Sequence, residues 1–105
     1  MAGYNLFCLT SSASFSNGNY VPCALKASGK VTLLGRTSGG GSCFVMPLST
    51  AYGTDFRISS PWRMSFAKNG SFYDIDRGAE PDFSLAKLST FYDRAALTDY
   101  INDLK

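Results

Sequence analysis

The chain has 105 residues, of which 45% are hydrophobic and 14% aromatic, so it can form one packed domain or a part of one. Its net charge is only +2, and its ten Lys and Arg residues are scattered, whereas nucleic-acid grooves gather basic residues on one face. No apolar run approaches the roughly 20 residues that cross a bilayer, and the first residues lack the pattern of a signal peptide. We therefore expect no nucleic-acid partner and no membrane segment in this chain.

The three cysteines are expected to be buried free thiols. Cys8, Cys23 and Cys43 lie far apart among apolar neighbours, and their odd number without a C-x-x-C pair argues against disulfides and a zinc site. A cysteine nucleophile would need a nearby base, and the chain contains no histidine. The acidic residues form no calcium-loop pattern, so we expect neither a metal nor another cofactor.

Residues 4–36 have the pattern of a strand–helix–strand unit. Residues 4–10 are a nearly continuous apolar run, which is typical of a strand covered on both faces. Residues 15–28 carry apolar side chains at helical spacing, and residues 30–36 form the next apolar strand. Because such crossovers are right-handed, the two strands should be parallel neighbours, and the fold class is α/β.

The remainder of the chain predicts a short antiparallel meander over residues 43–76 and a final helix over residues 92–104. Short alternating segments are separated by turn signals, including Ser59-Ser60-Pro61 and the strong hairpin signal Asn69-Gly70. Asp93 is the expected N-cap of the helix, whose apolar stripe is formed by Leu97, Tyr100, Ile101 and Leu104. Because parallel sheets normally contain more than two strands, the chain is interpreted as the second half of a larger domain.

Serines lie where the first strand meets the helix, in Ser11-Ser12-Ala13-Ser14-Phe15-Ser16. A serine at such a junction can act as a nucleophile, because the strand fixes its hydroxyl and the helix start offers free N–H groups to an oxyanion. Pro22 favours a helix that begins near Asn19, which would leave the serines on a short loop ahead of it. The alternative interpretation is a polar turn in which the serines serve only as caps.

Three motifs follow one another along the chain. The first strand, Ser-Ala-Ser-x-Ser, the helix and the second strand lead into Gly-x-Thr-x-Gly-Gly-Gly at residues 35–41. Gly78-Ala79-Glu80-Pro81-Asp82 comes next, and Asp93 is followed by Leu97. This order resembles the catalytic core of the C-terminal-processing (tail-specific) serine peptidases and their tricorn-like relatives, which use a Gly-Val-x-Pro-Asp segment and an Asp-x-x-x-Leu helix start. The resemblance covers most of residues 5–104.

The resemblance implies that residues 1–105 are the C-terminal part of a serine peptidase catalytic domain with a ClpP/crotonase-like β/α core. It places the nucleophile on Ser14, with Ser12 and Ser16 as alternatives if the register shifts by two residues. The backbone N–H of Phe15 would be one oxyanion donor. The second donor would come from an upstream Gly-Gly stretch that this chain does not contain.

The general base is expected from a missing N-terminal part of the same protein. Tail-specific members use a lysine at the position of Gly40, and the tricorn branch uses a histidine from an earlier segment. Lys26 and Lys30 are expected to be solvated at a helix end rather than to act as bases. A supporting carboxylate is expected close to Ile75, which nominates Asp76, with Asp74 and Glu80 as further candidates. The glycines at 39–41 are expected to form a tight turn rather than a phosphate cradle.

Two classes of function follow. The first is a serine peptidase that cleaves peptide or protein substrates through an acyl-enzyme, in which this chain alone is inactive; relatives are commonly extracytoplasmic and often carry a PDZ module. The second is a non-catalytic peptide-binding or assembly domain, which the absent histidine and Asn17-Gly18 favour, because the family often has an acidic residue there. A crotonase-like acyl-transfer enzyme is a third option. In either class, an uncovered first strand predicts self-association of the chain.

Overall fold

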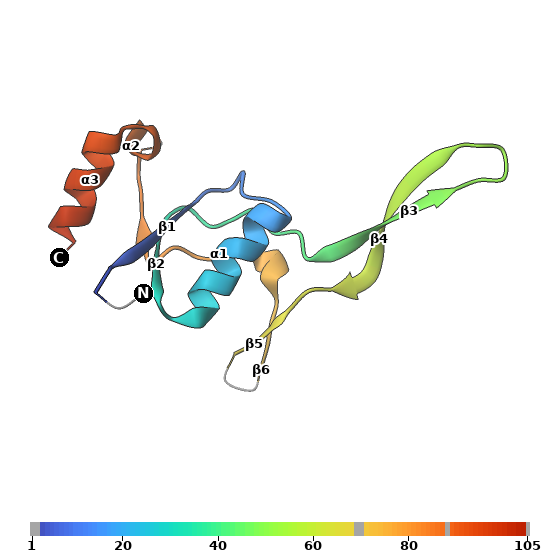
Figure 1. Cartoon of the computed structure of the whole chain (residues 1–105), viewed down its shortest axis with the longest axis horizontal. Helices are drawn as coiled ribbons and strands as arrows, with labels where there is room; N and C mark the ends of the chain where they lie inside the picture. The colour runs from blue at the N-terminus through green and yellow to red at the C-terminus, as the bar shows by residue number, and fades with distance from the viewer. Residues whose placement is uncertain (1–2, 69–70, 88, 105) are drawn as a thin grey trace.

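The chain has a mixed α/β structure, seen in a computed structural model that describes residues 3–68, 71–87 and 89–104 (Figure 1). Its parallel sheet has the order β1-β2-β7, with β1 at Leu6–Thr10, β2 at Val31–Gly35 and β7 at Phe83–Ser84. Helix α1 (Asn17–Ser28) connects β1 to β2. The α/β class and the predicted strand–helix–strand unit are therefore confirmed, whereas the two-residue β7 was not predicted.

The two long strands of the sheet differ in how well they are covered. Both faces of β2 are covered, because Leu33 and Leu34 occupy successive positions and are fully buried. Strand β1 pairs with β2 in parallel over all five residues of each strand, but no described strand pairs with its other edge. Leu6 and Leu9 remain 36% and 39% exposed. The expectation that the first strand is covered on both faces is therefore wrong for this chain.

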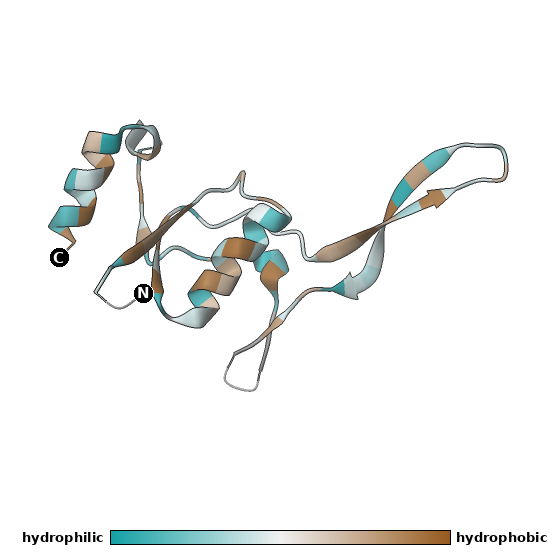
Figure 2. Cartoon of the chain, viewed as in Figure 1, coloured by the Kyte–Doolittle hydropathy of each residue, from teal (hydrophilic) through white to brown (hydrophobic). Residues whose placement is uncertain are grey.

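The core lies between α1, β2 and the segment after β6. Cys23, Leu33, Ile75 and Ala79 form a fully buried cluster, and Figure 2 shows apolar residues on α1 and on the neighbouring strands. Burial of a large aliphatic side chain contributes about 1.5–3 kcal/mol, so this small cluster supplies much of the stability. All three cysteines are free, but only Cys23 is fully buried, and the other two are half-buried.

Helix α1 begins at Asn17 rather than near Asn19, so Pro22 lies inside it and is buried. The proline ring has no N–H, which leaves the carbonyl oxygen of Gly18 without its usual helical donor. Packing of this face into the core offsets that loss. At the other end, Gly29 adopts a left-handed conformation with φ +68° and its N–H donates to the Lys26 carbonyl oxygen (3.1 Å).

Two separate hairpins replace the single meander that was expected. Strand β3 (Cys43–Ser49) pairs antiparallel with β4 (Asp55–Arg63), and β5 (Phe66–Lys68) pairs antiparallel with β6 (Ser71–Tyr73). The predicted turn at residues 59–61 is wrong, because β4 continues through Pro61. The pairing shifts there, and proline is tolerated in such a bulge. Asn69-Gly70 lies outside the described residues, but the flanking Lys68 and Ser71 pair, as a two-residue hairpin loop requires.

The C-terminal segment contains a break that the sequence interpretation did not include. Instead of one helix over residues 92–104, the chain forms α2 (Ser89–Tyr92) and α3 (Arg94–Asp103). Asp93 lies between them as the N-cap of α3, and its side chain accepts hydrogen bonds from the N–H groups of Ala95 and Ala96. The predicted cap is confirmed. No helix in the described part of the chain is long and apolar enough to cross a membrane.

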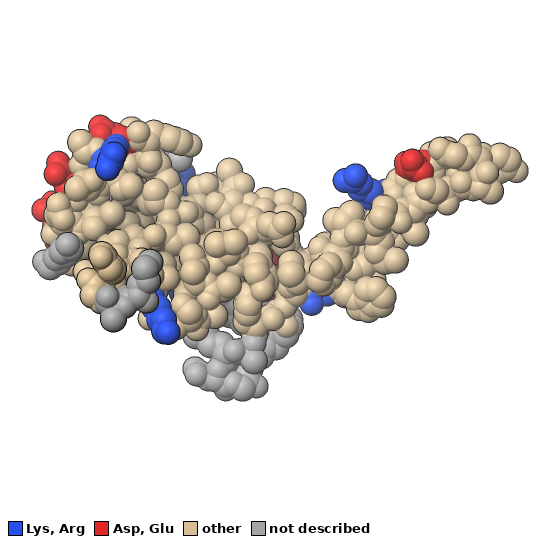
Figure 3. Space-filling view, in the orientation of Figure 1, with Lys and Arg blue, Asp and Glu red and all other residues tan. Residues whose placement is uncertain are grey.

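The β3–β4 hairpin projects from the body of the molecule as an arm (Figure 1). The radius of gyration is 17.2 Å, whereas a compact domain of this length would have about 13 Å. Met46 pairs with Ile58 and Leu48 with Phe56, so these four side chains share one face, which we call the apolar arm face. Three of the four are 37–44% exposed. Two-stranded hairpins are marginally stable alone, so we expect the apolar arm face to pack against another surface. On the side of the molecule seen in Figure 3, acidic side chains gather at the end formed by the C-terminal helices.

Candidate functional site

The serine turn, residues 11–16, connects β1 to α1. The Ser14 N–H donates to the Ser11 carbonyl oxygen (2.9 Å), and the Ser14 hydroxyl accepts a hydrogen bond from the Ser11 N–H (3.2 Å). Ser14 is half-buried. The Ser14 hydroxyl is therefore already occupied by a backbone hydrogen bond within the serine turn.

Ser16 has the least common backbone conformation in this region. Its φ is +57° and its ψ −119°, and no other non-glycine residue in the described ranges has a positive φ. Such a conformation costs about 1–3 kcal/mol and persists only where the surroundings enforce it. Ser16 is exposed, and although it is the N-cap of α1, its side chain makes no capping hydrogen bond. Among the described residues the hydroxyl therefore has no hydrogen-bond partner, and it lies at a strained turn between a strand and a helix.

Backbone N–H groups on both sides of Ser16 are available to a ligand. The N–H groups of Gly18 and Asn19 donate to the carbonyl oxygens of Phe15 and Ser16. By contrast, the N–H groups of Phe15 and Asn17 have no hydrogen-bond partner within the part of the chain that the structure describes. Free N–H groups at a helix start favour a negatively charged atom.

The glycine turn, residues 39–41, packs directly against the serine turn. The Gly39 N–H donates to the Ser14 carbonyl oxygen (2.8 Å), and the Ser16 N–H donates to the Gly40 carbonyl oxygen (3.0 Å). A Cβ at Gly41 would lie only 3.0 Å from the Phe15 ring and from the Ser16 nitrogen. The predicted tight turn does not form, because residues 37–42 contain neither a hydrogen-bonded turn nor a bend, and the glycines instead let this segment pass close to the serine turn and to Asp76. This close approach also explains Gly40, where φ is +83° and a Cβ would lie 2.5 Å from the Asp76 carbonyl oxygen, so a lysine does not fit.

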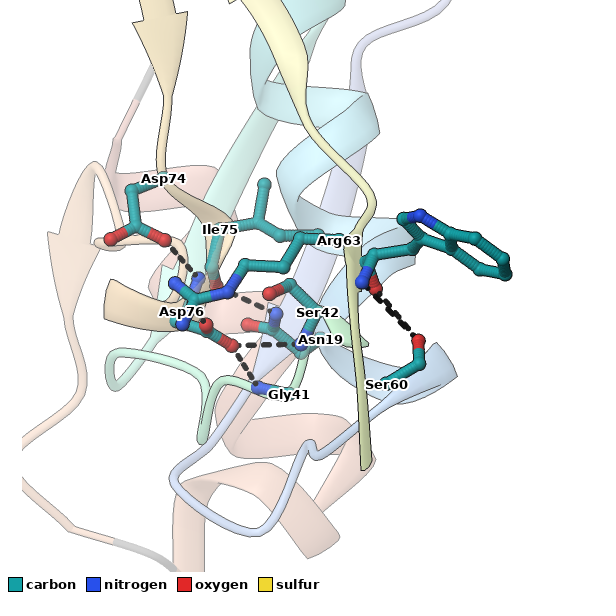
Figure 4. Close-up of polar contacts among 9 residues, drawn as sticks. Asn19, Gly41, Ser42, Ser60, Arg63, Asp74, Ile75 and Asp76 are labelled. Atoms are coloured by element: carbon teal, nitrogen blue, oxygen red, sulfur yellow. Dashed lines mark hydrogen bonds and ion pairs between the residues drawn. The ribbon is translucent and has the colours of Figure 1, made fainter. Parts of the chain in front are cut away.

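Asp76 holds the glycine turn from the other side. It lies in the short 3-10 helix η1 (Ile75–Arg77), and one carboxylate oxygen accepts hydrogen bonds from the N–H groups of Gly41 (3.2 Å) and Ser42 (2.8 Å) (Figure 4). Its other oxygen lies 3.4 Å from the Arg63 guanidinium. The carboxylate therefore binds two backbone N–H groups and the Arg63 side chain, and among the described contacts the glycine turn is what links it to the serine turn.

These contacts lower the pKa of Asp76 below its ordinary value. The Ser42 side chain has the largest effect, and the Ser42 N–H, the Arg63 guanidinium and the Gly41 N–H lower the pKa further against an opposing effect of burial. The Ser42 hydroxyl is buried and makes no well-aligned hydrogen bond with a described residue. Its effect on the pKa of the carboxylate is therefore that of a nearby dipole. Asp76 is thus held as a carboxylate.

The other nominated carboxylates and lysines lie elsewhere or have other partners. Asp74 caps η1 and accepts the Asp76 N–H (3.1 Å), and the Glu80 side chain is exposed. Lys26 contacts Asp82 (3.8 Å) and the Glu80 carbonyl oxygen. Ten residues of helix separate Lys26 from Ser16, which corresponds to about 15 Å along the axis. Lys26 is therefore no base for the serine turn.

Two of the three cysteines are made unreactive by burial. Burial raises the pKa of the Cys8 and Cys23 thiols, which keeps them in the unreactive thiol form at neutral pH. Within the described ranges, no three His, Cys, Asp or Glu side chains form a group that could hold a metal ion.

A buried polar network beneath the site was missed by the sequence interpretation. Asn19 is fully buried on α1; its amide donates to the Ile75 carbonyl oxygen (2.8 Å), and its side-chain oxygen accepts the Ser38 hydroxyl (2.6 Å). The Ser38 hydroxyl in turn accepts the Ala79 N–H (2.7 Å). One signal was available, because Asn19 lies four residues before the buried Cys23 and thus on the same helix face.

Comparisons with known proteins add no assignment. No protein-family model matches the chain, and no curated protein sequence matches it.

Proposed function

We propose that this chain is the nucleophile-bearing part of a serine peptidase core, of the tail-specific or tricorn-like kind with a ClpP/crotonase-like fold. The observation that carries the proposal is the Ser16 hydroxyl, which is exposed, makes no capping hydrogen bond to α1, and lies on a strained turn between β1 and α1. Strained non-glycine residues cluster at active sites, and a sharp strand-to-helix turn is how several hydrolases present a serine.

The geometry favours Ser16 over Ser14 as the nucleophile. The Ser14 hydroxyl already accepts a backbone hydrogen bond, whereas the Ser16 hydroxyl is free. With Ser16 as nucleophile, the oxyanion donor is the N–H of the following residue, Asn17, rather than that of Phe15. Both N–H groups lack a partner in the described part of the chain, so the choice depends on the serine.

The proposed reaction needs a base from outside these 105 residues. The Ser16 oxygen attacks the peptide carbonyl carbon while its proton passes to that base, and the N–H of Asn17 stabilises the oxyanion. The C–N bond then breaks and the amine leaves with the proton. Water hydrolyses the ester and restores the Ser16 hydroxyl. The missing N-terminal part of the protein would supply the base and the second oxyanion donor, and would add a strand to the open edge of β1.

A non-catalytic peptide-binding or assembly domain is the second candidate. Two observations favour it: the chain has no histidine, and no lysine fits at Gly40. In this candidate the uncovered edge of β1 and the apolar arm face serve association alone.

A fluorophosphonate probe applied to the complete protein separates the two candidates. We expect labelling that Ser16→Ala abolishes and that Ser14→Ala, a matched loss of one hydroxyl two residues away, preserves. Labelling lost only in Ser14→Ala would return the nucleophile to Ser14. Absence of labelling at every pH would refute the peptidase and favour the binding domain.

A further inference from the structure

The two ends of the arm meet at one carboxylate. Ser42 precedes β3 and Arg63 ends β4, and Asp76 binds the N–H of the first and the guanidinium of the second (Figure 4). The Met64 N–H also donates to the Ser42 carbonyl oxygen (2.8 Å), which closes the base of the arm. Asp76 therefore fixes where the arm leaves the body.

The same carboxylate is one step from the serine turn. Its oxygen also accepts the Gly41 N–H, and the preceding residue, Gly40, accepts the Ser16 N–H with its carbonyl oxygen. The backbone of Asp76 packs on Gly40 closely enough to exclude a side chain there. Gly40 and Gly41 are thus held between Asp76 and Ser16, and displacement of the glycine turn would remove the acceptor of the Ser16 N–H.

We propose that Asp76 is a positioning residue, which holds the strained conformation of Ser16 through the glycine turn. Charged acceptors form hydrogen bonds about twice as strong as neutral ones, so the carboxylate fixes the turn better than an amide can. Arg63 on β4 faces the carboxylate, and Asp74 and Arg77 adjoin it on its own segment. From α1 the neighbouring group is the neutral amide of Asn19, bound to Ile75. The functional meaning of this role rests on the proposed function, but the structural link does not.

Site-resolved hydrogen exchange of the isotopically labelled chain at constant near-neutral pH tests this link. In Asp76→Asn we expect exchange of the Ser16 and Gly41 amides to accelerate at least ~10-fold, because a charge-assisted bond is weakened. The amide of Leu33, in the core strand β2, should not change. Asp74→Asn, which neutralises the neighbouring carboxylate, should leave the Ser16 amide at the wild-type rate.

Equal acceleration at Ser16 and Leu33 would mean a general loss of stability and would overturn the proposal, as would an unchanged Ser16 amide. If Asp76→Asn does not fold, Arg63→Gln provides the test. The NMR chemical shifts of the Gly41, Ser42 and Ser16 amides should titrate with one common pH midpoint, and removal of the guanidinium should raise that midpoint. A Ser16 chemical shift that does not follow the other two would refute the link. Exchange and probe labelling are independent: unchanged exchange with Ser16 labelled refutes only the positioning role. Faster exchange without labelling of the complete protein refutes only the peptidase.

Discussion

Asn19→Ala should remove the polar centre of the core. Asn19 is fully buried and joins three segments: α1, on which it lies, η1 through the Ile75 carbonyl oxygen, and the chain after β2 through the Ser38 hydroxyl. The alanine keeps the helix but provides neither a donor nor an acceptor. We expect these segments to separate more easily.

The structure limits the size of the effect. Two hydrogen bonds, to Ile75 and Ser38, are lost at about 0.5–1.5 kcal/mol each, and the small cavity left by the amide adds about 1 kcal/mol. The Cys23 thiol, a weak donor, also loses its acceptor. Ile75 and Ser38 are not left wholly unsatisfied, since Ile75 still accepts the Gly78 N–H and Ser38 still accepts the Ala79 N–H. The expected loss is therefore about 2–4 kcal/mol, a large share of the 5–15 kcal/mol typical of a domain. It corresponds to a fall in Tm of roughly 10–30 °C.

Urea unfolding followed by circular dichroism measures this loss. Asn17→Ala is the matched control, because Asn17 is exposed on the same helix, and its substitution should change stability by less than about 0.5 kcal/mol. A double-mutant cycle with Ser38→Ala should give a coupling of about 1 kcal/mol. Equal stabilities of the two asparagine variants, or no coupling to Ser38, would refute the reasoning.

Three further predictions concern the glycine turn, Asp76 and the arm. Gly41→Ala places a Cβ 3.0 Å from the Phe15 ring at φ +92°, so the free energy of unfolding in urea should fall by at least about 2 kcal/mol. Gly53 has a similar φ but open space around it, so Gly53→Ala should cost about 1 kcal/mol. Equal costs would contradict the packing argument. Because the folded pKa of Asp76 is lowered, its stabilising contribution is complete above the unfolded pKa near 3.8 and is lost as the pH falls through the folded pKa. Asp76→Asn should therefore lose less stability than the wild type between pH 5 and about pH 2, and an identical acid dependence would argue against this assignment. In sedimentation velocity the chain should self-associate, and Ile58→Ser on the apolar arm face should weaken this more than Val45→Ser on the opposite face; a wild-type monomer at high concentration would refute it.

The α/β unit was predictable because its signals are local. A continuous apolar run, a helical stripe and a second run lead to β1, α1 and β2, and the Asp93 cap is equally local. The end of α1 at Ser28 agrees with the predicted range 15–28. Its start at Asn17 was not predictable, since the helix includes Pro22 and core packing decides that balance. The bulge at Pro61 likewise depends on the pairing of β4 with β3. The short helix α2 before the Asp93 cap was missed although its hydrogen bonds are local.

The candidate site was predictable as a segment but not as an arrangement. The serine turn and the glycine turn both stand out in the sequence. The choice between Ser14 and Ser16 depends on backbone dihedrals and on which hydroxyl is occupied, and residue types do not encode these directly. Asp76 was nominated as a supporting carboxylate of the site, whereas it contacts the Arg63 guanidinium and the N–H groups of Gly41 and Ser42, and such backbone contacts leave no trace in a sequence.

The close approach of Gly40 to Asp76 limits how a serine–lysine pair could be built into this chain by substitution. Exchange of the glycine for lysine, the simplest step toward a serine–lysine pair, needs a left-handed lysine and displacement of the backbone at residue 76. Two distant segments would have to change together. Directed evolution that starts from this sequence would therefore gain a base more readily at a position outside the glycine turn than at Gly40.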